Sequence, residues 1–94
     1  LEFSMLKTLE NLILTIRQKK ISPDEKSYTS KLLRDKNLSV EKVKEEIAEL
    51  IEAVENNSNT VHEAADVLYH LLVYLEGNGV RIEDIMLELD KRRK

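Results

Sequence analysis

The sequence predicts an all-α protein, a bundle of four to five helices that is completed by association of two copies. Only two glycines and one proline interrupt the chain, and its β-branched residues do not alternate with polar ones as they would in a strand. Apolar residues instead recur at three- and four-residue spacings. A chain of 94 residues without cysteine buries a limited core, so a second copy would provide further cover.

The first two helices are predicted from an apolar face and from a start signal. Leu6, Leu9, Ile13 and Ile16 share one face of a helix at about residues 6–20. The segment "SPDE" (22–25) then predicts a second helix, with Ser22 as its N-cap, proline in the first turn and a glutamate that closes a capping box. We expect this helix to continue through "SYTSKLL" and to fade near residue 36.

Three further helices follow from the same reasoning. Ser39 is a candidate N-cap for the third, whose apolar stripe is expected to face inward: Val40, Val43, Ile47, Leu50, Ile51 and Val54. The fourth begins near Asn59 or Thr60 and ends at "GNG" (77–79), where glycine suits the left-handed backbone that terminates helices. The last spans about residues 82–91 with four residues directed inward: Ile82, Ile85, Met86 and Leu89.

Composition excludes several classes of function. With 15 basic against 18 acidic residues and a net charge of −3, the chain lacks the basic field of a nucleic-acid-binding domain. Its apolar runs are too short to span a membrane, and no signal peptide is visible. These features and the lack of cysteine predict a cytoplasmic protein. We interpret residues 1–4 ("LEFS") as vector-derived, which leaves 5–94 as a single domain.

Two pairs of carboxylates are the main candidates for chemistry. Glu46 and Glu49 stand at i and i+3 beside the apolar stripe of the third helix, and Glu63 and Asp66 repeat that spacing on the fourth. On consecutive antiparallel helices the two pairs can converge. Four carboxylates suit a hard cation, Mg²⁺ or Mn²⁺, of the kind that also binds substrate phosphates.

Asp66 carries most of this interpretation. The fourth helix is apolar on nearly all sides from residue 64 to 75, and no lysine or arginine occurs between Lys44 and Arg81. An ionised carboxylate is unfavourable there unless it is paired or bound to a cation. Glu63 has an alternative explanation, a capping box with Thr60, whereas Asp66 lies beyond the first turn.

Simpler readings stay open for other residues. Glu46 and Glu49 can belong to a solvated acidic face that pairs with Lys42 and its neighbours. His70 can orient a ligand or contact substrate, but a hydrogen-bonded packing role is more common for a histidine among apolar residues. We expect His62 to be exposed, and Tyr69 and Tyr74 to belong to the core or an interface.

The acidic motifs also carry a family resemblance. "EExxE", formed by Glu45, Glu46 and Glu49, followed by "ExxD", formed by Glu63 and Asp66, resembles the signature of the all-α MazG-type nucleoside triphosphate pyrophosphohydrolases. Within that superfamily, three segments are similar to the phosphoribosyl-ATP pyrophosphohydrolase family of histidine biosynthesis: "SYTSKLL" (27–33), "EKVKEEIAELIEA" (41–53) and "EAADVLYHLLVYL" (63–75).

The resemblance implies a MazG-like bundle, a homodimer and Mg²⁺-dependent hydrolysis of phosphoribosyl-ATP to phosphoribosyl-AMP and pyrophosphate. It implies that Glu46, Glu49, Glu63 and Asp66 ligate the metal, with Mn²⁺ as a possible substitute. Glu45 would bind a further cation, orient a ligand or help to activate water. The residues on the substrate side would be Ser27, Tyr28, Thr29, Lys31, Lys42 and His70. Lys44 and Asn37 stand where the family usually has glycine, which leaves the shape of the substrate loop open.

Two other functions fit parts of the pattern. A MazG-type enzyme acting on a (d)NTP would keep the fold and the metal but change the substrate. A non-catalytic dimeric helical module that binds protein partners would keep the fold alone, and it leaves the placement of Asp66 unexplained.

Overall fold

A computed structural model describes residues 6–93, so the interpretation of residues 1–4 lies outside the described residues. The described chain consists of five helices: α1 (Leu6–Ile21), α2 (Tyr28–Arg34), α3 (Lys36–Asn56), α4 (Thr60–Gly77) and α5 (Ile82–Arg92). The all-α prediction is therefore confirmed. Among these helices none is both long and apolar enough to cross a lipid bilayer.

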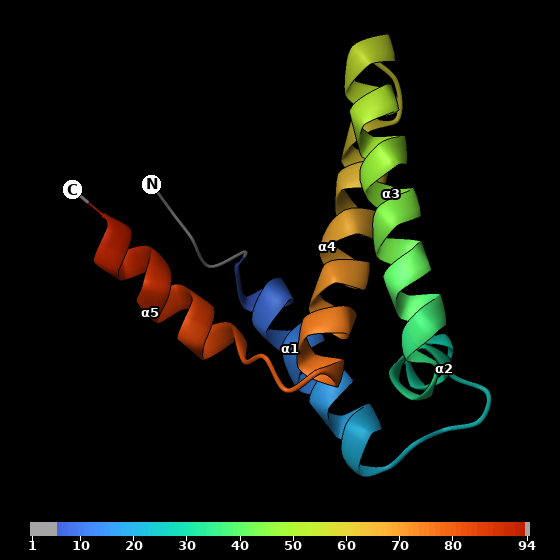
Figure 1. The fold of residues 1–94 in the computed structure, drawn as a ribbon, viewed down its shortest axis with the longest axis vertical. Coiled ribbons are helices and arrows are strands. Elements are labelled where there is room, and N and C mark those ends of the chain that lie inside the picture. Colours follow the sequence, from blue (N-terminus) through green and yellow to red (C-terminus); the bar gives the residue numbers. More distant parts are fainter. Residues whose placement is uncertain (1–5, 94) are drawn as a thin grey trace.

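Helix α4 is the centre of the fold. Figure 1 shows α3 and α4 as a long antiparallel hairpin, with α1 and α2 at its lower end and α5 leading away from the end of α4. Helix α4 packs against each of the other four helices, most extensively against α3. Any side chain on α4 is therefore carried by the helix that has the most contacts with the rest of the fold.

The apolar core lies at the base of the hairpin. It is formed by residues of α1, α2 and α4: Ile13, Ile16, Leu32, Leu72 and Val73. Ile16, Leu32 and Val73 are essentially fully buried. Helix α3 adds no member to this cluster, although Leu38 at its start packs against it. The hairpin beyond the core is therefore available for polar chemistry between α3 and α4.

Helix α2 begins later than the sequence pattern predicts. Ser27, not Ser22, is its N-cap, and the Ser27 hydroxyl oxygen accepts a hydrogen bond from the Ser30 N–H at 3.2 Å. The predicted capping box at residues 22–25 is wrong because Asp24 forms a turn there. Its side chain accepts from the Lys26 N–H at 3.0 Å and its carbonyl from the Ser27 N–H at 2.9 Å.

The prediction of Ser39 as a cap for α3 is also wrong. Asp35 fills that position, and its Oδ1 accepts from the Leu38 N–H at 3.1 Å. Asp35 also ends α2, where its N–H donates to the Lys31 carbonyl. One residue thus separates two helices, and Ser39 is buried within the first turns of α3.

The ends of α4 agree with the prediction, with one difference at the start. The helix begins at Thr60 after a left-handed Asn59 (φ 54°), and no side chain caps it. The Thr60 hydroxyl donates instead to the Ala53 carbonyl at 3.4 Å, so the proposed capping box does not form. Glu63 is therefore left without its alternative explanation. At the other end, Gly79 takes the left-handed conformation (φ 75°) and Val80 N–H donates to the Leu75 carbonyl at 2.9 Å.

Helix α5 agrees only in part with the expectation that its apolar side faces inward. Ile82 packs against the core and Ile85 is half-buried. Met86 and Leu89 are about half exposed, so the expectation is wrong for these two residues. The helix packs against the end of α4 and is also tied to α1 by an ion pair.

Arg17 on α1 joins the end of α4 to α5. Its guanidinium donates to both carboxylate oxygens of Glu76 at 2.9 Å, and it also donates to Glu83 on α5. The Glu76 side chain is only 4% exposed, and the ammonium group of Lys20 donates to its carbonyl at 2.6 Å. The hydrogen bonds from Arg17 lower the pKa of Glu76, and they lower the pKa of Glu83 to about 2. Arg17 is therefore an ionic clamp that fixes where α5 leaves the bundle.

Replacing Arg17 with Gln should lower the free energy of unfolding at pH 7 by about 2 kcal/mol, because it leaves Glu76 charged and buried without its main partner. Both carboxylates have a lowered pKa in the folded state. Their stabilisation is therefore present above the ordinary value of 4.5 and lost as the pH falls toward about 2. Urea unfolding at pH 7 and pH 3 checks this, since the difference between the two proteins should shrink at pH 3.

The matched control is Arg81→Gln, which breaks only an exposed pair with Glu83. That change should alter the unfolding free energy by less than about 0.5 kcal/mol. Equal losses for the two variants would mean that the buried Glu76 does not depend on Arg17.

Candidate active site and metal centre

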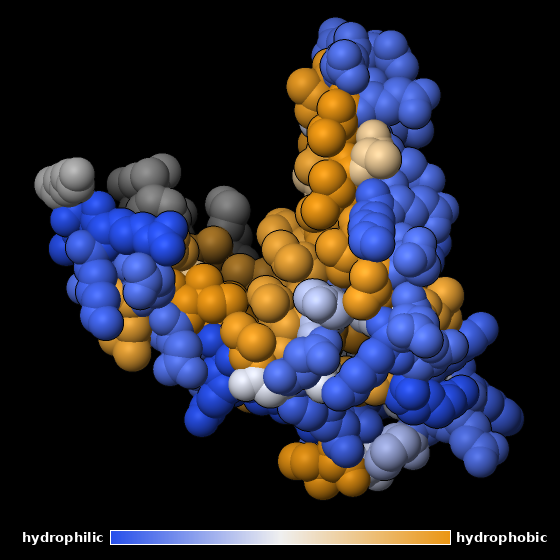
Figure 2. All heavy atoms as spheres, viewed as in Figure 1, coloured by the Kyte–Doolittle hydropathy of each residue, from blue (hydrophilic) through white to orange (hydrophobic). Residues whose placement is uncertain are grey.

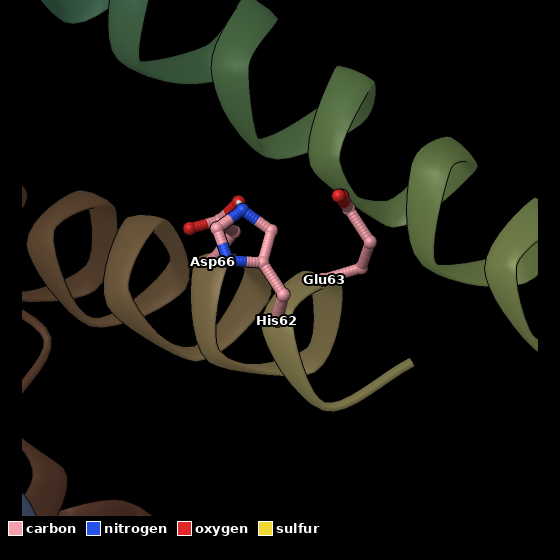
Figure 3. A group of neighbouring side chains, drawn as sticks. All are labelled: His62, Glu63 and Asp66. Carbon is pink, nitrogen blue, oxygen red and sulfur yellow. Dashed lines mark ion pairs between the residues drawn. The ribbon is translucent and has the colours of Figure 1, made fainter. Parts of the chain in front are cut away.

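The hairpin brings the four predicted carboxylates together in two overlapping groups. Ligand atoms of Glu46, Glu49 and Glu63 lie within 4.8 Å of one another, and so do those of His62, Glu63 and Asp66. Figure 3 shows the second group on α4, with Glu63 directed toward α3. Glu63 belongs to both groups. The i, i+3 spacing on each helix is therefore realised as one acidic centre between α3 and α4.

The burial of these side chains differs from the expectation. Asp66 was predicted to be the enclosed charge, but its side chain is 36% exposed and lies 3.3 Å from the His62 imidazole. Glu46 is the most enclosed, at 6% exposure. Glu46 faces α4, whereas three members of the predicted apolar stripe, Ile47, Ile51 and Val54, are 41%, 55% and 58% exposed. The prediction of an inward stripe is therefore wrong for these three residues, while its other members are half-buried.

The electrostatics of the centre are unfavourable without a cation. Glu46 Oε2 and Glu63 Oε2 are buried and have no hydrogen-bond partner among the described residues. Burial raises the pKa of Glu46, and the neighbouring Glu49 and Asp66 raise it further. Burial also raises the pKa of Glu63, together with its contact with Glu49. The ionised forms of Glu46 and Glu63 are therefore disfavoured at these positions.

These observations are what a site for a hard divalent cation requires. The donor set is oxygen-rich, two of its oxygens lack partners, and the repulsion among the carboxylates disappears when they share a positive charge. An unpaired buried polar atom is rare in a folded protein unless an ion or water satisfies it. The residues present therefore fit Mg²⁺ or Mn²⁺.

Lys42 stands beside the acidic centre. Its ammonium group donates to Glu45 at 3.2 Å and lies 3.6 Å from Glu46 Oε1. The hydrogen bond to Glu45 raises the pKa of Lys42, so it remains a cation. Glu45 itself is exposed. Both residues thus lie beside the acidic centre, Glu45 on its exposed side.

Tyr28 and His70 link α2 to the backbone of α4. The Asp66 carbonyl lies 2.8 Å from His70 Nδ1 and can only accept, so that nitrogen carries the proton. Nε2 then accepts from the Tyr28 hydroxyl at 3.0 Å. His70 is buried with both ring nitrogens satisfied, which agrees with the packing role. The pair fixes the start of α2 one turn away from Asp66.

The other residues predicted for the substrate side are mostly engaged in structure. Ser27 caps α2, and the Thr29 hydroxyl bonds the Tyr69 hydroxyl, whose ring stacks against Tyr28 with centroids 6.3 Å apart. Lys31 is exposed on α2 and forms no ion pair with another described residue. The role of these residues toward the substrate stays a prediction.

An open pocket of about 210 Å³ adjoins the centre at the tip of the hairpin. Two of the carboxylates, Glu49 and Glu63, line it, together with neutral groups from the α3–α4 turn: Asn56, Ser58 and Asn59. His62 is a residue that sequence reasoning did not connect with the site. Its only signal was the i, i+4 spacing to Asp66.

Comparison with known proteins agrees with the resemblance of the motifs. The sequence profile of the phosphoribosyl-ATP pyrophosphohydrolase family matches residues 9–93. The phosphoribosyl-ATP pyrophosphatase of Methanoregula boonei is 42% identical over 94 residues, which covers 95% of this chain and 90% of that protein. That of Methylobacterium nodulans is 42% identical over 88 residues, with 90% and 82% covered.

Some relatives are longer proteins. The histidine biosynthesis bifunctional protein HisIE of Pyrococcus furiosus is 41% identical over 92 residues, which covers 97% of this chain but only 42% of that protein. The chain thus spans less than half of such bifunctional relatives and nearly all of the single-function ones. Both the matched profile and these identities lead to one conclusion: the chain belongs to the phosphoribosyl-ATP pyrophosphohydrolase family.

Proposed function

We propose that this chain hydrolyses phosphoribosyl-ATP to phosphoribosyl-AMP and pyrophosphate in histidine biosynthesis, with Mg²⁺ as cofactor and Mn²⁺ as a substitute. The observation that carries the proposal is the acidic centre between α3 and α4, with its two partnerless buried oxygens, in a member of this family. A cytoplasmic location belongs to the proposal and is supported by the absence of cysteine.

Glu46, Glu49, Glu63 and Asp66 would hold the metal ion, since their carboxylates converge from two helices. Bound there, the cation supplies neutralisation of the negative charge on the phosphates at the cleaved linkage. Glu45 lies beside this centre and is exposed, so it can accept a proton from the attacking water. The water oxygen then bonds to the α phosphorus as the bond to the bridging oxygen breaks, and pyrophosphate leaves.

Residues of α2, together with Lys42, would contact the substrate. The Lys42 ammonium group contacts both Glu45 and Glu46. It can instead bind a phosphate oxygen of the substrate as a point charge. Tyr28 is held over the centre by its bond to His70. Ser27 and Thr29 would act by fixing the first turn of α2, and Lys31 by adding positive charge to its exposed face.

The test is an assay of pyrophosphate release from phosphoribosyl-ATP and from a panel of dNTPs, with Mg²⁺ and with EDTA. We expect turnover of phosphoribosyl-ATP to exceed that of every dNTP and to stop in EDTA. Faster turnover of a dNTP would assign the chain to the wider MazG-type enzymes instead. The absence of any Mg²⁺-dependent turnover would favour a non-catalytic dimeric module.

A homodimer is the second part of the proposal. Figure 2 shows apolar surface running along the hairpin and across the concave face toward the α1 and α5 side. Large exposed apolar side chains come from α3, α4 and α5: Ile47, Ile51, Val54, Val61, Leu68, Met86, Leu87 and Leu89. A surface of this kind is unusual on a monomer, and a second copy offers the same apolar stripe to cover it.

Replacing Ile51 with Lys should convert the dimer to a monomer at micromolar concentration. A charge in the middle of an apolar interface removes a buried contact and adds an unpaired ion, so the dissociation constant should rise by about 30-fold or more. Sedimentation velocity measures this directly. Glu41→Lys, an exposed change on the same helix, is the control and should remain dimeric. A monomeric wild-type chain would refute the dimer.

A further inference from the structure

His62 lies beside the acidic centre because it directly precedes Glu63 on α4. Its Nε2 lies 3.3 Å from Asp66 Oδ2, and its ring nitrogen, a Glu63 oxygen and an Asp66 oxygen all lie within 4.8 Å of one another. Figure 3 shows the His62 ring beside the Asp66 carboxylate. Three potential ligand atoms from adjacent turns therefore face one point with an imidazole among them.

We propose that His62 is a direct ligand of the cation centre, and that with Glu63 and Asp66 it makes a mixed nitrogen and oxygen site for the divalent cation. This inference rests on the proposed function, since it concerns the metal ion of the same centre. It goes further by adding a ligand that the carboxylate motifs do not include.

A second observation connects this group to a ligand. Glu46, from the opposite helix, is buried to more than nine-tenths, and its Oε2 has no partner among the described residues. Glu46 and Glu63 share the first group, and Glu63 shares the second with His62. A cation at the shared residue would satisfy the orphan oxygens on α3 and α4 together.

Mn²⁺ is a suitable probe for this ligand because it takes the same carboxylate oxygens as Mg²⁺. The simpler reading is an i, i+4 ion pair in which a protonated His62 neutralises Asp66. That reading predicts no bond from nitrogen to the metal.

The experiment uses Mn²⁺ alone, added to the full chain after treatment with EDTA and desalting. Pulsed EPR of the bound Mn²⁺ detects a directly coordinated ¹⁴N nucleus, and titration of the free-ion signal gives affinities for Mn²⁺ and, by competition, for Mg²⁺. The chain has only two histidines, so His62→Ala and His70→Asn together assign any imidazole signal.

We expect the ¹⁴N coupling in the wild-type chain and in His70→Asn, and its loss in His62→Ala. His62→Ala should weaken Mn²⁺ binding by about 10-fold, the lower end of losses seen when metal-site partners are removed.

Bound Mn²⁺ without ¹⁴N coupling, or coupling that persists in His62→Ala, would overturn the inference and leave the carboxylate centre intact. A wild-type chain that binds neither ion would overturn the inference together with the cation centre. Turnover of phosphoribosyl-ATP by the same proteins with Mg²⁺ tests the proposed reaction separately, so the two failures are distinguishable.

Discussion

Asp66→Asn should lower kcat/KM for phosphoribosyl-ATP by about 10³-fold, equivalent to about 4 kcal/mol of transition-state stabilisation. The amide keeps the shape of the side chain but removes the charge that would hold the cation. Because Asp66 is 36% exposed and contributes no core packing, the variant should fold like the wild type. Steady-state pyrophosphate release and circular dichroism check the two halves of this prediction.

The matched control for Asp66 is Asp90→Asn, a change of the same type on α5 at an exposed residue. It should leave activity within about twofold, as expected for a surface charge away from the site. Wild-type turnover in Asp66→Asn would remove Asp66 from the centre. Equal losses in both variants would point to a general effect of charge.

Glu46→Gln should inactivate the enzyme and stabilise the metal-free protein. Its carboxylate is buried beside Glu49 and Asp66, which raise its pKa together with burial. Neutralising it removes that repulsion, and we expect the unfolding free energy without metal to rise by about 1–2 kcal/mol. Lys42 keeps Glu45 as a partner, so little is lost there. Such opposite effects on stability and activity mark a residue retained for function.

Thermal unfolding with and without Mg²⁺ measures the effect. In the wild type, Mg²⁺ should raise the melting temperature because it binds only the folded state, whereas in Glu46→Gln the rise should be much smaller. The control is Glu52→Gln, a more exposed change on the same helix, which should leave the Mg²⁺ response in place. A destabilised metal-free Glu46→Gln would show that Glu46 is a structural residue.

The sequence predicts the helices well and their starts less well. The residues that cap α2 and α3 are Ser27 and Asp35, where Ser22 and Ser39 fit the same local patterns. Several acceptors compete within a few residues, and the tertiary packing of the short α2 decides among them. The end of α4 is easier to predict because glycine is the residue that most readily takes the left-handed conformation found at Gly79.

The sequence predicts which carboxylates come together in the candidate site, but it does not predict how deeply each of them is buried. The spacing of Glu46 and Glu49, and of Glu63 and Asp66, places each pair on one helix face. Which face of α3 meets α4 is a tertiary property. Half of the apolar stripe that a helical wheel turns inward is left exposed: Ile47, Ile51 and Val54. The sequence did not indicate that His62 lies beside the site, because polar residues are common in the first turn of a helix.

We propose that the carboxylates between α3 and α4 hold the cation of the reaction. A crystal structure of the chain with Mn²⁺, using the anomalous signal of the metal, tests this most directly. We expect an anomalous peak within bonding distance of carboxylate oxygens from both helices, Glu46 or Glu49 on one side and Glu63 or Asp66 on the other. A peak elsewhere, or none between the two helices at saturating Mn²⁺, would contradict it.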